Sequence, residues 1–214
     1  MNIWHDIDPA MIRPENFSAL IEIPKGGKCK YELDKRTGIL RLDRVLYTST
    51  HYPANYGFIP RTYADDGDPL DVLVLSNEEI DPLVLVRCYP IGVITMLDNG
   101  KNDEKIIAIP FSDPTYSGYQ SIDDLPRHVF NEMEHFFTVY KQLEHKQTSV
   151  NPVMGRARAV EIIASAMERY RLRIHTENEA VARKCFTLLR KTFSINSDVS
   201  VHLHKRNGKG SQIY

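Results

Sequence analysis

Four carboxylates fall within one seven-residue segment of this chain, Asp65-Asp66-Gly67-Asp68-Pro69-Leu70-Asp71. Its Gly-Asp-Pro core favours a turn, and the apolar run after Asp71 predicts a buried strand that would hold this carboxylate on a rigid element. Two carboxylates about 5 Å apart at an effective dielectric constant near 20 repel by roughly 3 kcal/mol. The crowded group therefore needs protons or cations, and its hard oxygen ligands suit Mg²⁺, Mn²⁺ or Ca²⁺ better than Zn²⁺.

The spacing of this segment excludes an EF-hand calcium loop. Leu70, Asp71 and Asn77 stand where that loop requires a ligand, a glycine and a glutamate. A second polar segment, residues 98–105, contains Asp98 and Asp103 and lies between two β-rich runs. Alone it is typical of a polar hairpin loop, but together with the first segment it would complete a site for several metal ions.

Cationic and hydroxyl side chains recur along the same part of the chain. They are Lys30, Arg44, Tyr52, Tyr56, Lys105, Tyr140 and Lys141. Each of them alone is typical of a surface charge or a half-buried aromatic ring. A site that combines several carboxylates with several cations fits metal-assisted phosphoryl transfer.

Short β-rich runs fill the first two-thirds of the sequence. We expect strands at residues 18–24, 29–33, 39–45, 71–75, 83–96 and 105–109. The fifth of these strands should bend near Pro90 and Gly92. Because the six strands follow one another without intervening helices, they favour a barrel over a βαβ sheet.

Helical periodicity begins after about residue 120. We expect a first helix from Leu125 to about residue 145, with Asp124 as its N-cap. A second helix should start at Asn151-Pro152, and its inner face would consist of Val160, Ile163, Ala164 and Met167. A third helix is predicted from a capping box at residues 176–179 to about residue 193, and a last strand at residues 199–204.

Bulk composition indicates a globular protein, since 42% of the residues are hydrophobic and 26% are charged. The three cysteines form no CxxC pair, which favours a reducing compartment. No run approaches transmembrane length, so we expect a cytoplasmic protein without a membrane partner. From Arg169 onward ten Lys and Arg face three Asp and Glu, although the whole chain has a net charge of −1. This asymmetry predicts a core of residues 1–170 and a basic extension of residues 171–214.

The acidic segment has the form Asp-x-Asp-Pro-x-Asp followed by an aliphatic residue, and here the chain resembles the compact bacterial type of soluble inorganic pyrophosphatase. The resemblance covers about residues 15–170. Further matching segments are residues 21–24, 30–32, 43–44, 52–57, 92–93 and 136–141, with Asp98, Asp103 and Lys105 between them. The resemblance implies an α+β fold, a small closed five-stranded OB-like β-barrel with flanking helices.

The resemblance also implies a role for each matching residue in the hydrolysis of pyrophosphate to two phosphates. Mg²⁺ ions, for which Mn²⁺ could substitute, would be held by Asp66, Asp71, Asp98, Asp103 and, through water, Glu32. Asp68 would orient the attacking water and take its proton. The phosphates would be bound by Lys30, Arg44, Tyr56, Lys105, Tyr140 and Lys141. Glu22 matches an acidic position of the family and is expected to have a supporting role.

Assembly and two other functions stay open at this point. Bacterial members often form hexamers through histidines on the long helix; here His135 is present, but Val139 stands one turn later. We expect a homo-oligomer of unspecified size, with residues 171–214 at a subunit interface or covering the core. The alternatives are a non-catalytic OB-type module that binds metal or nucleic acid, and a phosphatase that acts on nucleotides. Nucleic acid is disfavoured because the basic extension lacks interleaved aromatic residues.

Overall fold

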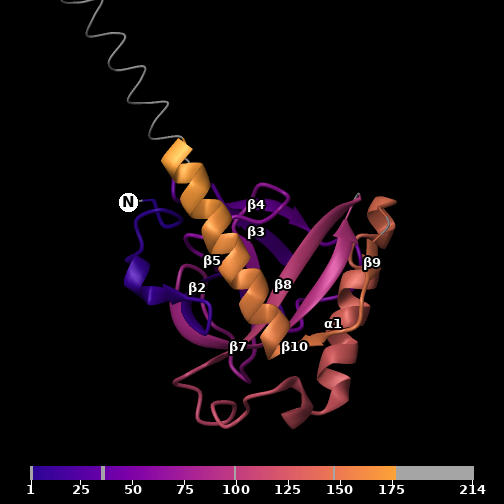
Figure 1. Ribbon diagram of the computed structural model, residues 1–214. Helices are drawn as coiled ribbons and strands as arrows, with labels where there is room; N and C mark the ends of the chain where they lie inside the picture. The colour runs from indigo at the N-terminus through magenta and orange to yellow at the C-terminus, as the bar shows by residue number, and fades with distance from the viewer. Residues whose placement is uncertain (1, 35–36, 99, 147, 177–214) are drawn as a thin grey trace, which may run out of the picture. The chain divides into compact units, whose positions relative to one another are not determined.

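The computed structural model describes residues 2–34, 37–98, 100–146 and 148–176 (Figure 1). The chain divides into two compact units, residues 1–170 and 171–214, and the strands and helix α1 described below belong to the first. The third helix and the last strand expected from the sequence lie outside the described residues. Within the described ranges, no helix is long and apolar enough to cross a membrane.

Five strands form a closed ring. In order around the ring they are β2 (Asn16–Ile23), β5 (Asn55–Ile59), β6 (Leu70–Val74), β8 (Lys101–Pro110) and β7 (Leu85–Asp98). The pairing of β7 with β2 closes the ring, and all of its pairings are antiparallel except the one between β6 and β8. The α+β class with a closed five-stranded ring, expected from the sequence, is confirmed.

Two close approaches of the backbone explain why glycines occur inside these strands. A Cβ atom on Gly57 would lie 1.8 Å from the carbonyl oxygen of Leu20, so β2 and β5 can pair as they do only with glycine there. A Cβ atom on Gly92 would lie 2.7 Å from the carbonyl oxygen of Met154. The expected irregularity of β7 is present as a register shift against β8 between Pro90 and Gly92.

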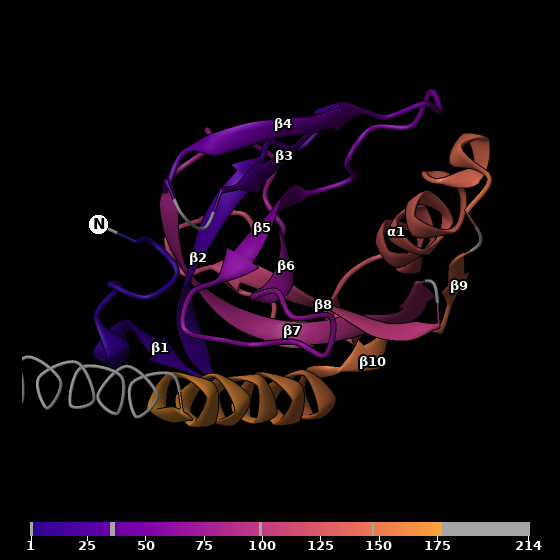
Figure 2. The same ribbon diagram turned by 90° about the horizontal axis from the view of Figure 1, so that it is seen from above.

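A second, two-stranded sheet stands apart from the ring. It is the hairpin of β3 (Cys29–Leu33) and β4 (Leu40–Val45), in which Lys30 pairs with Arg44. Figure 2 shows this hairpin on the opposite side of the ring from β7. The short strands β1 (Ile12–Arg13), β9 (Thr148–Val150) and β10 (Met154–Gly155) pair with β2 or β7.

The two faces of the ring strands pack against different helices. Helix α1 (Arg127–Val139) buries Phe130, Met133, Phe136 and Phe137, which share a core cluster with Leu73 and Ile107. A helix over residues 156–176 buries Ala159, Ile162, Ile163 and Ala166, which share another cluster with Val72 and Ile106. Because neighbouring strand residues point to opposite faces, adjacent positions in β6 and β8 serve the two clusters.

Several expected boundaries were wrong. β5 was not predicted. Asp124 does not cap α1, because it closes a separate 3-10 turn, η2 (Ile122–Asp124), where its side chain completes a capping box with Ser121. Helix α1 ends at Val139, and the 3-10 turn η3 (Gln142–Glu144) follows. The next helix starts at residue 156 rather than 151, and Ala164, expected on its inner face, is exposed.

Candidate active site

A cavity of about 450 Å³ gathers most of the side chains that the sequence predicted for the site. Those that line it are Lys30, Glu32, Tyr56, Asp66, Asp68, Asp71, Asp103, Lys105, Tyr140 and Lys141. They come from β3, β5, β6, β8, the loop before β6 and the residues just after α1. Residues more than 100 positions apart in the sequence therefore face one space.

The parallel pairing of β6 with β8 places Lys105 beside Asp71. The Lys105 Nζ lies 2.7 Å from an oxygen of Asp71 and 2.8 Å from an oxygen of Asp103. It also donates to the Tyr56 hydroxyl at 3.1 Å, and Tyr56 donates to Asp71 in turn. Burial opposes a charged Lys105, which is only 2% exposed, but Asp103 and Asp71 raise its pKa well above the usual value. One ammonium group is therefore held between two carboxylates.

The same environment acts on the partners of Lys105. Burial raises the pKa of the Asp71 carboxyl, and Lys105 opposes this shift. Burial also raises the pKa of the Tyr56 hydroxyl well above its ordinary value, and the nearby Asp71 adds to the effect. Tyr56 is thus a neutral donor, whereas Asp71 is an acceptor that favours a cation next to it.

The acidic segment forms the expected turn, in the loop of residues 60–69 that connects β5 with β6. Gly67 has φ +98°, a conformation that L side chains rarely adopt. The backbone N–H of Asp68 donates to the Asp66 side chain at 3.0 Å, and the carbonyl of Asp68 accepts from Ala64 N at 2.7 Å. Asp66 and Asp68 are exposed. This loop, called the acidic loop below, therefore contributes two solvent-exposed carboxylates to the lining of the cavity.

The hairpin of β3 and β4 supplies paired positive and negative charges to the site. Lys30 Nζ lies 2.5 Å from Glu32 and 3.5 Å from Asp43. Arg44 is not among the residues that line the cavity, because its Nε donates to Glu144 at 2.8 Å and its Nη1 to Asp43. The Arg44 Nη2 is buried without a hydrogen-bond partner among the described residues. The structure thus brings Lys30 and Glu32 to the cavity and holds Arg44 beside it.

The segment after α1 brings Tyr140 and Lys141 to the cavity. Both are buried, and the Tyr140 ring stacks on Phe136 with ring centres 5.2 Å apart. Tyr52 packs between Tyr56 and Phe136, with ring centres 5.1 Å and 4.9 Å away. These contacts tie the tyrosine side of the site to the core under α1.

From the sequence, Glu22 was expected to have only a supporting role, and Trp4, Asp34 and Arg41, which also line the cavity, were assigned none. Glu22 on β2 is 8% exposed, and its Oε1 accepts from the backbone N–H of Leu33 at 2.7 Å. Burial raises the pKa of Glu22 to about 8, although the bond from Leu33 opposes the shift. Trp4 also lines the cavity and was missed. Its only signal in the sequence is that it is the single tryptophan of the chain.

The position of Asp98 is described only through its backbone. It is the last residue of β7 and pairs with Lys101 across the β7–β8 hairpin, whereas Asp103 pairs with Met96 further along the same ladder. The side chain of Asp98 lies outside what the structure describes. Both aspartates of the second polar segment are therefore on one hairpin, as the sequence suggested.

The chemistry of the lining fits a hard divalent cation. Among the described residues that line the cavity, seven are Asp or Glu and four are Lys or Arg, so the negative charge is in excess. The described residues contain no group of three or more His, Cys, Asp or Glu arranged to hold a metal ion as they stand. Asp71 and Asp103 nonetheless hold a cation between them, the Lys105 ammonium. The carboxylate oxygens of this lining are the donors that Mg²⁺ and Mn²⁺ prefer.

Comparison with known proteins agrees with this site. The family model described as inorganic pyrophosphatase matches residues 19–171. The chain is 47% identical over 167 residues to soluble inorganic pyrophosphatase 2 of Chlamydomonas reinhardtii, which covers 78% of this chain and 87% of that protein. It is 45% identical over 167 residues to soluble inorganic pyrophosphatase 1 of Arabidopsis thaliana, which covers 78% and 79%.

Solved structures give the same result. The inorganic pyrophosphatase of Thermus thermophilus superposes with a TM-score of 0.75 at 38% identity, over 80% of this chain and 99% of that chain. That of Helicobacter pylori gives 0.72 at 42% identity, over 74% and 95%. A second family model, the WhiA N-terminal LAGLIDADG-like domain, matches residues 154–214 and overlaps the first over residues 154–171. Over residues 19–171, which include the whole cavity apart from Trp4, the chain belongs to the inorganic pyrophosphatase family.

Proposed function

We propose that this chain hydrolyses inorganic pyrophosphate to two orthophosphates by direct attack of water, with Mg²⁺ as the resident metal and Mn²⁺ as a substitute. The observation that carries the proposal is the cavity, in which carboxylates of β6, β8 and the acidic loop face lysines and tyrosines of β3, β5 and the segment after α1. Such a site can bind a polyanion only together with cations, because its own charge would otherwise repel phosphate.

The carboxylates are proposed to hold the divalent cations. Asp66, Asp71 and Asp103 would be ligands, with Asp98 nearby on the β7–β8 hairpin and Glu32 acting through water. The Lys105 ammonium between Asp71 and Asp103 supports this assignment, because it shows that the pair accommodates positive charge. When bound, the cations would neutralise phosphate oxygens and lower the pKa of water towards neutrality.

Asp68 is proposed as the general base. Its carboxylate is exposed and belongs to the lining of the cavity, so water can reach it. The backbone contacts with Asp66 and Ala64 fix the position of the residue in the turn. Asp68 would orient the attacking water and hold the proton that this water loses, and no covalent intermediate on the protein is needed.

Cationic and hydroxyl groups are proposed to bind the two phosphates. Lys30, Lys105 and Lys141 bring positive charge to the cavity, and Tyr56 and Tyr140 bring donors. These groups would stabilise the charge that develops on the leaving phosphate. Arg44 is proposed to join them. Since its Nε now donates to Glu144, the substrate would have to compete with that carboxylate.

The two alternatives differ in what they predict. A non-catalytic module would bind oligonucleotides in a salt-dependent way and release no phosphate. A nucleotide phosphatase would hydrolyse ATP as fast as pyrophosphate. The acidic lining of the cavity disfavours the first, because nucleic acid would meet an excess of carboxylates there.

A phosphate-release assay tests the proposal. The full chain should release two phosphates per pyrophosphate with MgCl₂ or MnCl₂, should lose the activity in EDTA, and should act far more slowly on ATP. A folded chain that releases no phosphate from pyrophosphate would refute the proposal. Release from ATP at least as fast as from pyrophosphate would favour the nucleotide phosphatase.

We also propose that the chain works in the cytoplasm as a homo-oligomer, and that residues 171–214 form a basic extension distinct from the core of residues 1–170. The absence of a CxxC pair from the sequence supports the location, and the charge asymmetry supports a distinct extension. Light scattering on the full chain tests the assembly. A mass of one chain at micromolar concentration would contradict it.

A further inference from the structure

The segment of residues 2–7 lies outside the region that the pyrophosphatase family model matches, yet it contacts the acidic loop. We propose that Trp4 in this segment is a positioning residue, which holds the acidic loop in the conformation that binds divalent cations. The inference rests on the proposed function, because it assumes that the acidic loop contributes metal ligands. It adds a residue that does not touch the reacting atoms and acts through the loop.

Trp4 is joined to the acidic loop by three kinds of contact. Its indole Nε1 donates to the carbonyl oxygen of Thr62 at 2.9 Å in a buried environment. Its ring is nearly parallel to that of Tyr63, with an interplanar angle of 8° and centres 6.1 Å apart. Its carbonyl accepts from the backbone N–H of Arg61 at 3.0 Å. The tryptophan, 7% exposed, is therefore packed on three consecutive residues at the start of the loop.

Thr62 connects this contact to the strand that carries Asp71. Its hydroxyl donates to the carbonyl of Ile59 at 2.6 Å and accepts from the backbone N–H of Leu70 at 2.8 Å. Ile59 ends β5 and Leu70 begins β6, so the Thr62 hydroxyl links the two ends of the loop. A displacement of Thr62 would therefore shift the two ends of the loop that contains Asp66 and Asp68.

Arg61 holds the N-terminal segment in place from the loop side. Its guanidinium donates to the carbonyls of His5 at 2.5 Å and Ile7 at 3.1 Å. Arg61 has φ +58°, a left-handed conformation that is costly for a residue with a side chain. Such a conformation persists when the surroundings fix it, and here the bonds to His5 and Ile7 and the bond to the Trp4 carbonyl do so.

The opposite side of the loop is held by the helix that begins at residue 156. The backbone N–H of Tyr63 donates to the carbonyl of Ala166 at 3.0 Å, and Arg169 Nε donates to the carbonyl of Tyr63 at 2.8 Å. Because these bonds do not involve Trp4, its replacement should loosen the loop without detaching it. The cost of ordering the loop would then be added to metal binding, which weakens affinity and leaves the chemical step unchanged.

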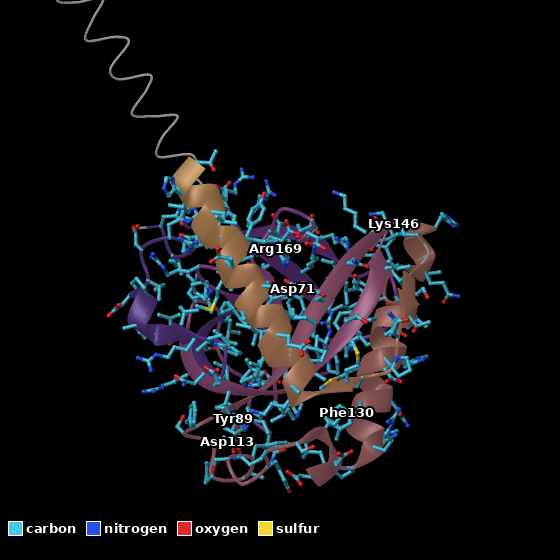
Figure 3. The ribbon with its side chains drawn as sticks, viewed as in Figure 1. Asp71, Tyr89, Asp113, Phe130, Lys146 and Arg169 are labelled. Atoms are coloured by element: carbon cyan, nitrogen blue, oxygen red, sulfur yellow. The ribbon has the colours of Figure 1, made fainter. Side chains whose placement is uncertain are left out.

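The variant Trp4→Phe removes the hydrogen bond to Thr62 and keeps a smaller aromatic ring beside Tyr63. The matched control is Tyr89→Phe. Tyr89 is also buried and donates to the carbonyls of Ser117 and Tyr119 at 3.1 Å and 2.7 Å, but it does not line the cavity. Figure 3 shows Tyr89 well away from Asp71.

Titration calorimetry of the full-length variants with MgCl₂ alone, without substrate, measures the effect. For Trp4→Phe we expect the dissociation constant of Mg²⁺ to rise about fivefold, the factor typical of one buried hydrogen bond. The value of kcat at saturating Mg²⁺ should stay within about twofold of the wild type, and Tyr89→Phe should leave Mg²⁺ affinity unchanged. Trp4→Ala, which also removes the ring, should weaken Mg²⁺ binding further.

Several results would overturn the proposal. They are unchanged Mg²⁺ affinity in Trp4→Phe, an equal loss in Tyr89→Phe, or a Trp4→Phe variant that loses kcat but keeps its affinity for Mg²⁺. Since Trp4 is the single tryptophan, its fluorescence in the wild type should change with Mg²⁺ at the calorimetric midpoint. If Trp4→Ala fails to fold, the comparison of the two phenylalanine variants decides. Metal titration uses no pyrophosphate, so it remains decisive even if the wild type releases no phosphate and the proposed function fails.

Discussion

The two sides of the cavity are built in different ways. Asp71 of β6 and Asp103 of β8 belong to the closed ring, where backbone ladders fix them, and the acidic loop connects two strands of that ring. Lys30 and Arg44 belong to a separate two-stranded sheet, which side-chain bonds tie to the remainder: Glu22 to Leu33, and Arg44 to Glu144. Two carboxylates proposed to hold metal are thus fixed by main-chain pairing, whereas Lys30 and Arg44, proposed to bind phosphate, depend on side-chain pairs.

This difference suits a site that has two tasks. The affinity for a metal ion falls when its ligands are displaced by a fraction of an ångström, so rigid backbone elements are suited to hold them. Cations that receive a polyanion must exchange partners when it arrives, and ion pairs can do so at lower cost than a β-ladder. Mutation and pH can each perturb one of the two sides.

The first test removes the proposed base from the acidic loop. Asp68→Asn should lower kcat by about a thousandfold, because an amide cannot take the proton from water. Steady-state phosphate release and thermal melting should be measured together, and the melting temperature should not change. The control is Asp65→Asn, also exposed in the acidic loop but outside the lining of the cavity. It should keep kcat within about threefold, and near-normal turnover in Asp68→Asn would remove this residue as the base.

The second test removes the internal cation. Lys105→Met leaves Asp71 and Asp103 facing each other without the ammonium, so the free energy of unfolding without metal should fall by about 2–4 kcal/mol. Urea unfolding in EDTA and in MgCl₂ measures this, and Mg²⁺ should restore part of the loss. Lys146→Met, which removes an exposed partner of Glu144, should cost less than about 0.5 kcal/mol. Equal free energies of unfolding for Lys105→Met and the wild type in EDTA would contradict the role of Lys105 as the cation that stabilises Asp71 and Asp103.

The third test uses pH to titrate Glu22, which joins the ring to the β3–β4 hairpin through Leu33. Burial raises the pKa of Glu22 from 4.5 to about 8. The folded chain therefore keeps this proton between those values while the unfolded chain loses it, so the stabilisation present below pH 4.5 declines as pH rises to about 8. Metal-free unfolding should show a slope of up to about 1.4 kcal/mol per pH unit in this window. Glu22→Gln should reduce that slope, and an unchanged slope would show that other groups cause it.

The fourth test loosens the exchangeable side. Glu144→Gln weakens the partner of Arg44 without changing its shape, so pyrophosphate should compete more easily and KM should fall by about threefold. The free energy of unfolding should fall by about 1 kcal/mol. Glu132→Gln, an exposed change on α1, is the control and should alter neither value. A rise in KM would instead mean that Glu144 holds Arg44 in place for the substrate.

The sequence predicted the chemistry of the site better than its connections. The carboxylates at 66, 68 and 71 share one turn, so spacing alone indicated a metal site. The bond between Arg44 and Glu144 joins residues 100 positions apart, and no periodicity or motif reports such a contact. Trp4 was missed for the same reason, since its role depends on Thr62, 58 positions away.

The errors in the fold also have physical causes. β5 was missed because Gly57 weakens the strand pattern, although that glycine is what lets β2 approach. The second helix starts later than its Asn-Pro signal because Met154 and Gly155 pair with Val93 and Gly92 of β7. In both places the requirements of tertiary pairing override local propensity, which a pattern along the chain cannot show.

The parallel pairing of β6 with β8 has a consequence for how quickly the protein can become active. In the sequence, β7 lies between β6 and β8, so the contact between Asp71 and Lys105 closes a long loop of chain. The ring itself closes when β2 pairs with β7, where Phe17 lies opposite Cys88. Contacts between such distant residues form late and slowly during folding. After dilution from urea, helical circular dichroism should therefore recover before catalysis does. Pyrophosphate hydrolysis should return with the slowest phase, because an incomplete ring has no site.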